Sequence, residues 1–145
     1  MVAYPETKKR KFELGRTVIT CGADVAINKI AASRCGVQYD EMGCKVVYTT
    51  PEQEDKVGLE DKVGLEYRLI TSTLIRQHSR LEKGVLEEGD YQQNIDACKY
   101  EEQRDKDGCL MQSRIFSAFN IDNIKFWVIT EFDRSVTTIL LPSEY

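Results

Sequence analysis

A short charged segment close to the end of the chain holds several side chains that could do chemistry. Glu131, Asp133, Arg134 and Ser135 follow closely on one another, a few residues after Trp127, the only tryptophan. Alternation along a strand places Glu131 and Asp133 on one side, where Arg134 could pair with either carboxylate. Such a group could bind a cation or a polar ligand, or support acid–base catalysis. We favour the simpler interpretation, an exposed ion pair that stabilises the tip of a hairpin.

His78 is the only histidine, and an imidazole normally titrates near neutrality. A catalytic histidine needs a carboxylate to orient it and a nucleophile to activate. Asp90 or Glu131 could orient the ring. Ser79 or Ser135 could be the nucleophile, but no spacing selects any of these residues. Because His78 lies on an apolar stripe at helical spacing, a packing role is favoured.

We expect neither a metal nor a cofactor. The five cysteines are widely spaced and include no C-x-x-C pair, whereas a structural zinc site needs close pairs of ligands. Their odd number fits no disulfide framework. We expect reduced thiols that pack as small apolar groups.

Length and composition indicate one globular domain. The chain has 145 residues, of which 41% are hydrophobic and 30% charged. A net charge of −4 and a pI near 5.1 disfavour a general nucleic-acid binder, whose affinity comes mostly from neutralising phosphates. No segment approaches the roughly 18 apolar residues of a membrane span. No apolar segment follows the basic residues 8–11, so we expect no signal peptide and a cytoplasmic protein.

Apolar residues recur at strand or helix spacing along most of the chain. Gly15 is the expected turn, and Gly36 the expected stop of a helix. The predicted elements before residue 110 are a short strand or hairpin at Phe12–Thr20, a helix around Ala23–Arg34, a strand at Lys45–Thr49, and helices at Tyr67–Leu81 and near Asp90–Arg104.

The segment from Arg114 to Leu141 predicts three antiparallel strands. Asp122-Asn123 supplies the first turn, since both residues tolerate positive φ. The middle strand is apolar on both faces, so we expect helices on one side and the N-terminal strand or a partner on the other. Pro142 should end the last strand at a sheet edge. The predicted fold is therefore α+β, a three-stranded antiparallel sheet packed with two or three helices and a short N-terminal strand.

A tandem repeat lies near the middle of the chain. Residues 54–59 and 60–65 are both EDKVGL, and each copy places a glycine where a helix would be weakened by about 1 kcal/mol. We interpret residues 1–11 as a flexible basic arm and 12–145 as a single domain, within which 36–66 is an insertion or loop and 52–66 is acidic.

The last nineteen residues, WVITEFDRSVTTILLPSEY from Trp127 to Tyr145, resemble a family of small uncharacterised proteins of plasmids, integrative elements and phages. RIFSAF at 114–119 and FELGRTVITCGA at 12–23 are similar to the family's preceding strand and N-terminal strand and turn. His78, Asp90 and Asn94 stand at compatible places. The resemblance covers about a third of the chain. LEKGVLEEGD replaces the family's usual Gly-Asp-Trp-Gly, and 36–66 looks like an insertion.

The resemblance implies a non-enzymatic accessory protein of a mobile element that acts by binding another macromolecule. A protein partner is expected, such as a CRISPR or restriction complex, whose basic nucleic-acid channel would meet the acidic segments 52–66 and 82–107. The candidate binding residues are Glu131, Asp133, Arg134, Ser135, His78 and Trp127.

Two alternatives stay open. The first is a small hydrolase or ligand-binding enzyme that uses His78 with Glu131, Asp133 and Arg134. The second is a DNA-binding regulator, for which the basic arm and helix arginines could contact phosphate, although aromatic residues are not interleaved with them. A sheet edge and a doubly apolar strand are also compatible with a homodimer.

Overall fold

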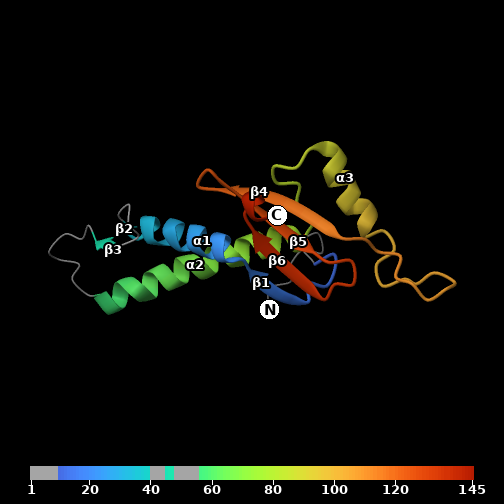
Figure 1. Ribbon diagram of the computed structural model, residues 1–145, viewed down its shortest axis with the longest axis horizontal. Helices are drawn as coiled ribbons and strands as arrows, with labels where there is room; N and C mark the ends of the chain where they lie inside the picture. Colours follow the sequence, from blue (N-terminus) through green and yellow to red (C-terminus); the bar gives the residue numbers. More distant parts are fainter. Residues whose placement is uncertain (1–9, 40–44, 48–55) are drawn as a thin grey trace, which may run out of the picture.

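The computed structural model describes residues 10–39, 45–47 and 56–145, and over these residues the fold is α+β, as predicted (Figure 1). A four-stranded mixed sheet packs against helices, and two further strands form a separate sheet. The basic arm lies outside the described residues except at its last two positions. The elements are β1 (Arg16–Ile19), α1 (Cys21–Arg34), β2 (Val37–Tyr39), β3 (Lys45–Val47), α2 (Lys56–Ser79), α3 (Glu88–Ala97), β4 (Ile115–Ile121), β5 (Ile124–Thr130), β6 (Val136–Leu140) and the 3₁₀ turn η3 (Pro142–Glu144).

The main sheet has the strand order β1-β6-β5-β4. β4, β5 and β6 form the predicted antiparallel meander, but β1 adds to β6 in parallel, with Val18 opposite Thr138. The expectation of a three-stranded antiparallel sheet with Pro142 at its edge is therefore wrong, because β6 lies inside the sheet. The edges are β1 and β4. The residues of β1 and β6 that pair are far apart in the chain, and neither strand's local pattern specifies the other.

The turn between β4 and β5 is the one that the sequence predicts. Asp122 has φ 48° and Asn123 has φ 67°, as a two-residue turn with two left-handed residues requires. Ile121 pairs with Ile124 across it, which sets the register of the two strands. The second turn also contains a left-handed residue, Arg134 with φ 59°.

One face of the sheet, the inner face, packs on α1 and α2. Alternation puts Phe126 and Val128 of β5 on this face, and neither is exposed to solvent. Ile27 of α1 and Leu74 of α2 are also fully buried and join them in one apolar core. Figure 1 shows the two helices side by side, extending beyond the sheet towards β2 and β3. Tyr67 of α2 donates a hydrogen bond to Asp24 of α1 at 2.5 Å, and burial raises the pKa of Tyr67 to about 12.

α1 follows its sequence signals closely. The Thr20 hydroxyl caps its first turn by accepting from the Ala23 amide at 3.3 Å, and Arg34 stands in its last turn. Gly36, with φ 78°, follows its end.

α2 begins well before the predicted Tyr67, so the loop expected across 36–66 is wrong for residues 56–66. The second EDKVGL copy lies wholly within this helix, whereas the first begins outside the described residues. The physical reason is tertiary: Val63 and Tyr67, four residues apart, both pack against the apolar core and continue the stripe of Ile70 and Leu74. This packing outweighs the weak helix propensity of Gly64, a cost of about 1 kcal/mol.

α3 spans Glu88–Ala97, so it begins two residues before the predicted Asp90–Arg104 and ends seven residues earlier. The carbonyl oxygen of Ala97, at the end of the helix, accepts from the Ser113 amide at 3.2 Å and from Arg134 at 3.4 Å. The chain therefore leaves the helix at a point where distant segments supply hydrogen-bond donors.

Two glycines provide a matched test of this fold. Gly15 has φ 63°, and an added Cβ would lie 2.3 Å from the carbonyl oxygens of Arg134 and Ser135. We expect Gly15→Ala to lower the free energy of unfolding by at least about 2 kcal/mol, since left-handed backbone and a backbone clash add. Gly64→Ala, in open space within α2, should raise it by about 1 kcal/mol. Urea denaturation measures both, and an unchanged Gly15→Ala midpoint would contradict the close approach of β1 to the β5–β6 turn.

Candidate functional site

His78 is fully buried beneath the inner face of the sheet, where both ring nitrogens meet hydroxyl groups. Nδ1 lies 2.7 Å from the Ser117 hydroxyl of β4, and Nε2 lies 2.7 Å from the Thr130 hydroxyl of β5. The Thr130 hydroxyl lies 2.6 Å from that of Thr137 on β6, which donates to the Leu14 carbonyl at 2.6 Å. These contacts join α2, three strands and the segment before β1 in one polar chain.

The number of available protons fixes the direction of donation along this chain of hydrogen bonds. Thr137 uses its one hydroxyl proton on Leu14, so Thr130 must donate to Thr137. Thr130 can then only accept from His78, which places the imidazole proton on Nε2. A neutral imidazole has one N–H, and Nδ1 therefore accepts from Ser117. Burial first, and then the positive charge of Arg134, lower the pKa of His78 to about 3, so the neutral ring that this chain requires is the form present at pH 7.

The alternative hydrolase arrangement around His78 is not formed. Its partners are hydroxyls rather than Asp90 or Glu131. The Ser79 hydroxyl donates to the Arg76 carbonyl at 2.9 Å, and that of Ser135 donates to Asp133 at 2.6 Å. The structure therefore supports the packing role that the apolar stripe of α2 indicates.

Arg134 is the second buried polar centre, and its side chain is only 5% exposed. Nε donates to both carboxylate oxygens of Glu101 at 3.1 and 3.2 Å, and a further bond joins Nη2 to the same carboxylate. Nη1 donates to the carbonyl oxygens of Ser113 at 2.6 Å and Glu131 at 3.1 Å. The guanidinium also lies 5.5 Å from the ring centroid of Phe12.

The ion pairs predicted for the charged turn are thus wrong. Arg134 pairs with Glu101, which is 33 residues earlier in the chain, and not with Glu131 or Asp133. Glu131 pairs instead with Arg114 at 3.5 Å across the sheet. Hydrogen bonds from Ser135 hold the pKa of Asp133 below its usual range. The reason is that the left-handed backbone at Arg134 turns its side chain into the protein, where carbonyl groups surround it.

Residues 82–109, here called the acidic lobe, surround α3 and the loop after it. The lobe holds nine acidic and four basic residues, a net charge of −5, so the remaining residues of the chain together carry +1. Two contacts fasten it to the sheet. Asn94 accepts from the Phe116 amide at 3.0 Å and donates to the Phe116 carbonyl at 2.5 Å, which covers the β4 edge. Arg134 holds Glu101 and the end of α3.

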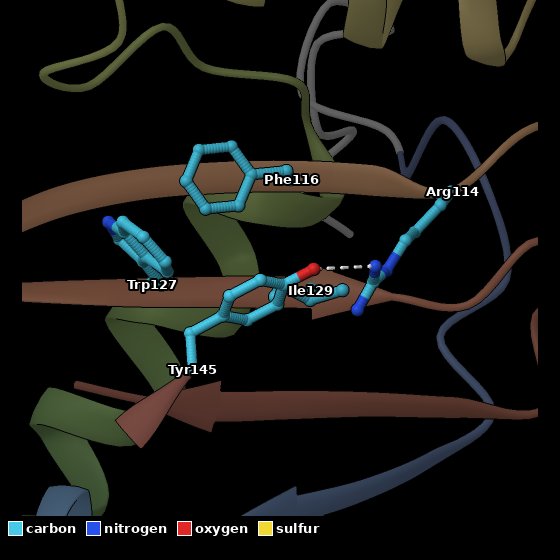
Figure 2. Close-up of a pocket in the computed structure, with 5 residues that line it drawn as sticks. All are labelled: Arg114, Phe116, Trp127, Ile129 and Tyr145. Atoms are coloured by element: carbon cyan, nitrogen blue, oxygen red, sulfur yellow. Dashed lines mark hydrogen bonds between the residues drawn. The ribbon is translucent and has the colours of Figure 1, made fainter. Parts of the chain in front are cut away.

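The other face of the sheet, the outer face, carries a small aromatic pocket (Figure 2). Phe116 of β4 and Trp127 of β5 meet edge to face with ring centroids 4.8 Å apart. The ring of Tyr145 lies 5.7 Å from Trp127 and, in Figure 2, passes in front of Ile129. Arg114 donates to the Tyr145 hydroxyl at 3.1 Å and closes one end. The pocket has a volume of about 240 Å³.

Tyr145 is held in place by the residue before it. Glu144 accepts from the Thr20 hydroxyl at 2.6 Å and from the Gly22 amide at 3.0 Å, at the start of α1. These bonds lower the pKa of Glu144, with the Thr20 hydroxyl as the largest cause. The favourable end of a helix dipole adds to the attraction.

The predicted binding residues therefore separate into three places. His78 and Arg134 are buried in the interior, Trp127 and Glu131 lie on the outer face, and Asp133 and Ser135 form an exposed turn. Sequence reasoning missed the other members of the pocket. The alternation of β4 and β5 was a usable signal, since it puts Phe116, Trp127 and Ile129 on one face, but Tyr145 reaches that face only through Glu144 and η3.

The chain has no significant match among protein-family models, curated proteins or solved structures. Within the described residues no cluster of three or more histidine, cysteine or acidic side chains could hold a metal ion. The four cysteines in this part of the chain are free thiols, and burial raises the pKa of Cys98 to about 11. No helix in the same residues combines the length and apolar character of a membrane-spanning segment.

His78 makes stability depend on pH in a definite direction. The folded pKa of about 3 lies below the usual unfolded value of 6.5, so the unfolded chain binds the proton first as the pH falls. Protonation of His78 should leave the free energy of unfolding unchanged above pH 6.5. It should lower that free energy by about 1.4 kcal/mol per pH unit between pH 6.5 and 3. When the pH is lowered from 7.5 to 5, the free energy of unfolding of the native chain should fall by about 2 kcal/mol more than that of the His78→Gln variant. Equal losses in urea titrations would show that His78 is not buried in neutral form.

Arg134 and Arg114 each pair with a glutamate, but one pair is buried and the other exposed. We expect Arg134→Ala to cost about 3–5 kcal/mol, because it leaves the Glu101 carboxylate without its cation and removes the guanidinium donor to the Ser113 carbonyl. Arg114→Ala, whose pair with Glu131 is open to solvent, should cost less than about 1 kcal/mol. Denaturant midpoints of the two variants test this contrast, and similar costs would contradict it.

Proposed function

We propose that the chain is a non-enzymatic accessory protein of a mobile genetic element, and that it binds a protein partner through the acidic lobe. The observation that carries the proposal is the segregation of charge. A lobe of net charge −5 is fixed to a body of +1 by Asn94 and by the Arg134–Glu101 pair. All its acidic residues except the anchored Glu101 are exposed, so their charge faces outward.

An anchored, single-sign surface is suited to recognition. Its field attracts a basic partner and raises the rate of encounter, while fixed positions of the carboxylates determine which basic surface fits. Anchoring at both α3 and Glu101 reduces the conformational entropy that binding would otherwise remove. The nucleic-acid channel of a defence complex is a basic surface of this kind, which is why a CRISPR or restriction complex is our proposed target.

The mobile-element setting comes from the resemblance of Trp127–Tyr145 to small proteins of plasmids, integrative elements and phages. The binding role is favoured over hydrolysis by the state of the polar centres. Both nitrogens of His78 and the guanidinium of Arg134 are occupied by internal partners. In their folded positions, neither is presented to a substrate.

Charge reversal in the lobe tests the proposal. Asp96→Lys with Asp107→Lys changes two exposed lobe positions, and Glu13→Lys with Asp61→Lys makes the same total change outside the lobe. Plasmid establishment would be measured in hosts that carry an active CRISPR or restriction system directed at the plasmid. We expect the native chain and the control pair to protect the plasmid. The lobe pair should weaken binding to the purified defence complex by about a hundredfold, since juxtaposed like charges cost several kcal/mol.

Two outcomes would refute this function. One is that the native chain protects the plasmid from none of the systems tested. The other is equal binding by the lobe pair and the control pair, with circular dichroism showing that both are folded.

A further inference from the structure

We propose that the outer face binds single-stranded nucleic acid, with one unpaired base stacked in the aromatic pocket. The pocket joins Phe116, Trp127 and Tyr145 around Ile129, with the Arg114 guanidinium at one end (Figure 2). Helices α1 and α2 cover the opposite face, whereas at the pocket Phe116 and Trp127 are half-buried and Tyr145 is exposed. An open sheet face with aromatic side chains is an arrangement on which proteins stack unpaired bases.

The charge around the pocket has the sign that a phosphate backbone requires. The register places Arg16 and Lys125 at outer-face positions, and Arg114 lines the pocket and pairs with the Glu131 carboxylate. All three basic residues are exposed. They lie on β1, before β4 and on β5, so they flank the aromatic residues rather than forming one cluster. The acidity of the chain as a whole resides in the lobe, which the outer face does not include.

The pocket fits a flat ring better than an aliphatic side chain. Three of its five lining residues are aromatic, and the Arg114 guanidinium lies 5.6 Å from the centroid of the Tyr145 ring. Planar groups of this kind stack on a nucleobase, and a guanidinium can also bind phosphate. An acidic peptide would satisfy the cations but would leave the aromatic faces without a matching partner. The nucleotide combines both features in one ligand.

Tyr145 makes the pocket selective for unpaired strands. It is 72% exposed, yet Glu144 fixes the end of the chain on Thr20 and Gly22, which holds its ring beside Trp127. A base in a duplex is already stacked on its neighbours and cannot pack against these rings, whereas an unpaired base can turn out to do so.

The only tryptophan lies in this pocket, so its fluorescence reports binding in the intact protein. Titration with an oligothymidylate of about ten nucleotides should quench Trp127, and a duplex of the same length should not. The binding constant should fall with salt, with a logarithmic slope of about −2 for three contacted phosphates. Tyr145→Ala should weaken binding about tenfold or more, whereas Tyr100→Ala, an exposed tyrosine of the acidic lobe, should bind as the native chain does.

A second pair of variants separates charge from stacking. Arg114→Gln should weaken binding and reduce the salt slope by about 0.7, while Arg68→Gln, on α2, should change neither. The absence of quenching at low salt would overturn the proposal, as would native binding by both Tyr145→Ala and Arg114→Gln. Quenching by an oligoglutamate peptide but not by the oligonucleotide would assign the face to a protein segment instead. The lobe variant Asp96→Lys, Asp107→Lys should bind the oligonucleotide at least as tightly as the native chain, so the two proposals fail independently.

Discussion

Arg134 lies almost completely out of water at a point where several segments of the chain meet. A buried guanidinium is tolerated only if its charge and its N–H groups are satisfied. Glu101 supplies the charge, and the carbonyl groups of Ala97, Ser113, Glu131 and Phe132 accept the remaining bonds. The end of α3, the approach to β4 and the β5–β6 turn are therefore held at one place. Moving any of them would leave a charge or a donor unpaired, which is why this side chain constrains the rest of the structure.

His78 is the second buried polar side chain, and it is neutral beside the charged Arg134. Phe12 lies between the two centres, edge to face with the imidazole at 5.1 Å and beneath the guanidinium at 5.5 Å. A second positive charge so close to Arg134 and so far from water would be unfavourable, and the imidazole stays neutral. Its neutral form then organises Ser117, Thr130 and Thr137 into a directed chain. Among the described residues, no buried side-chain nitrogen or oxygen lacks a hydrogen-bond partner.

These interior contacts also explain how one small domain presents two unlike surfaces. Asn94 and Glu101 attach the acidic lobe beside the β4 edge, while Glu144 attaches Tyr145 to the outer face near the start of α1. The carboxylates that serve as anchors are engaged within the chain. Those left exposed in the lobe face solvent beside the β4 edge, and the cations of β1 and β5 lie on the outer face. On the two proposals above, a partner that contains both protein and nucleic acid would meet both surfaces of the same molecule.

Local signals in the sequence determined a definite part of this structure. The caps and apolar spacing of α1, the Asp122-Asn123 turn and the alternation of β4, β5 and β6 each depend on residues close together in the chain, and each is observed. The interior position of His78 could also be predicted, because it shares a helical stripe with Leu74. Tertiary structure decided the rest. The parallel addition of β1 to β6, the early start of α2 and the pairing of Arg134 with Glu101 all depend on which distant groups meet. The aromatic pocket is of the same kind, since Arg114, Trp127 and Tyr145 are adjacent only after the sheet has formed and Glu144 has reached α1. Periodicity records which face of an element is apolar, but it contains no information about the distant group that will satisfy a buried charge or border a pocket.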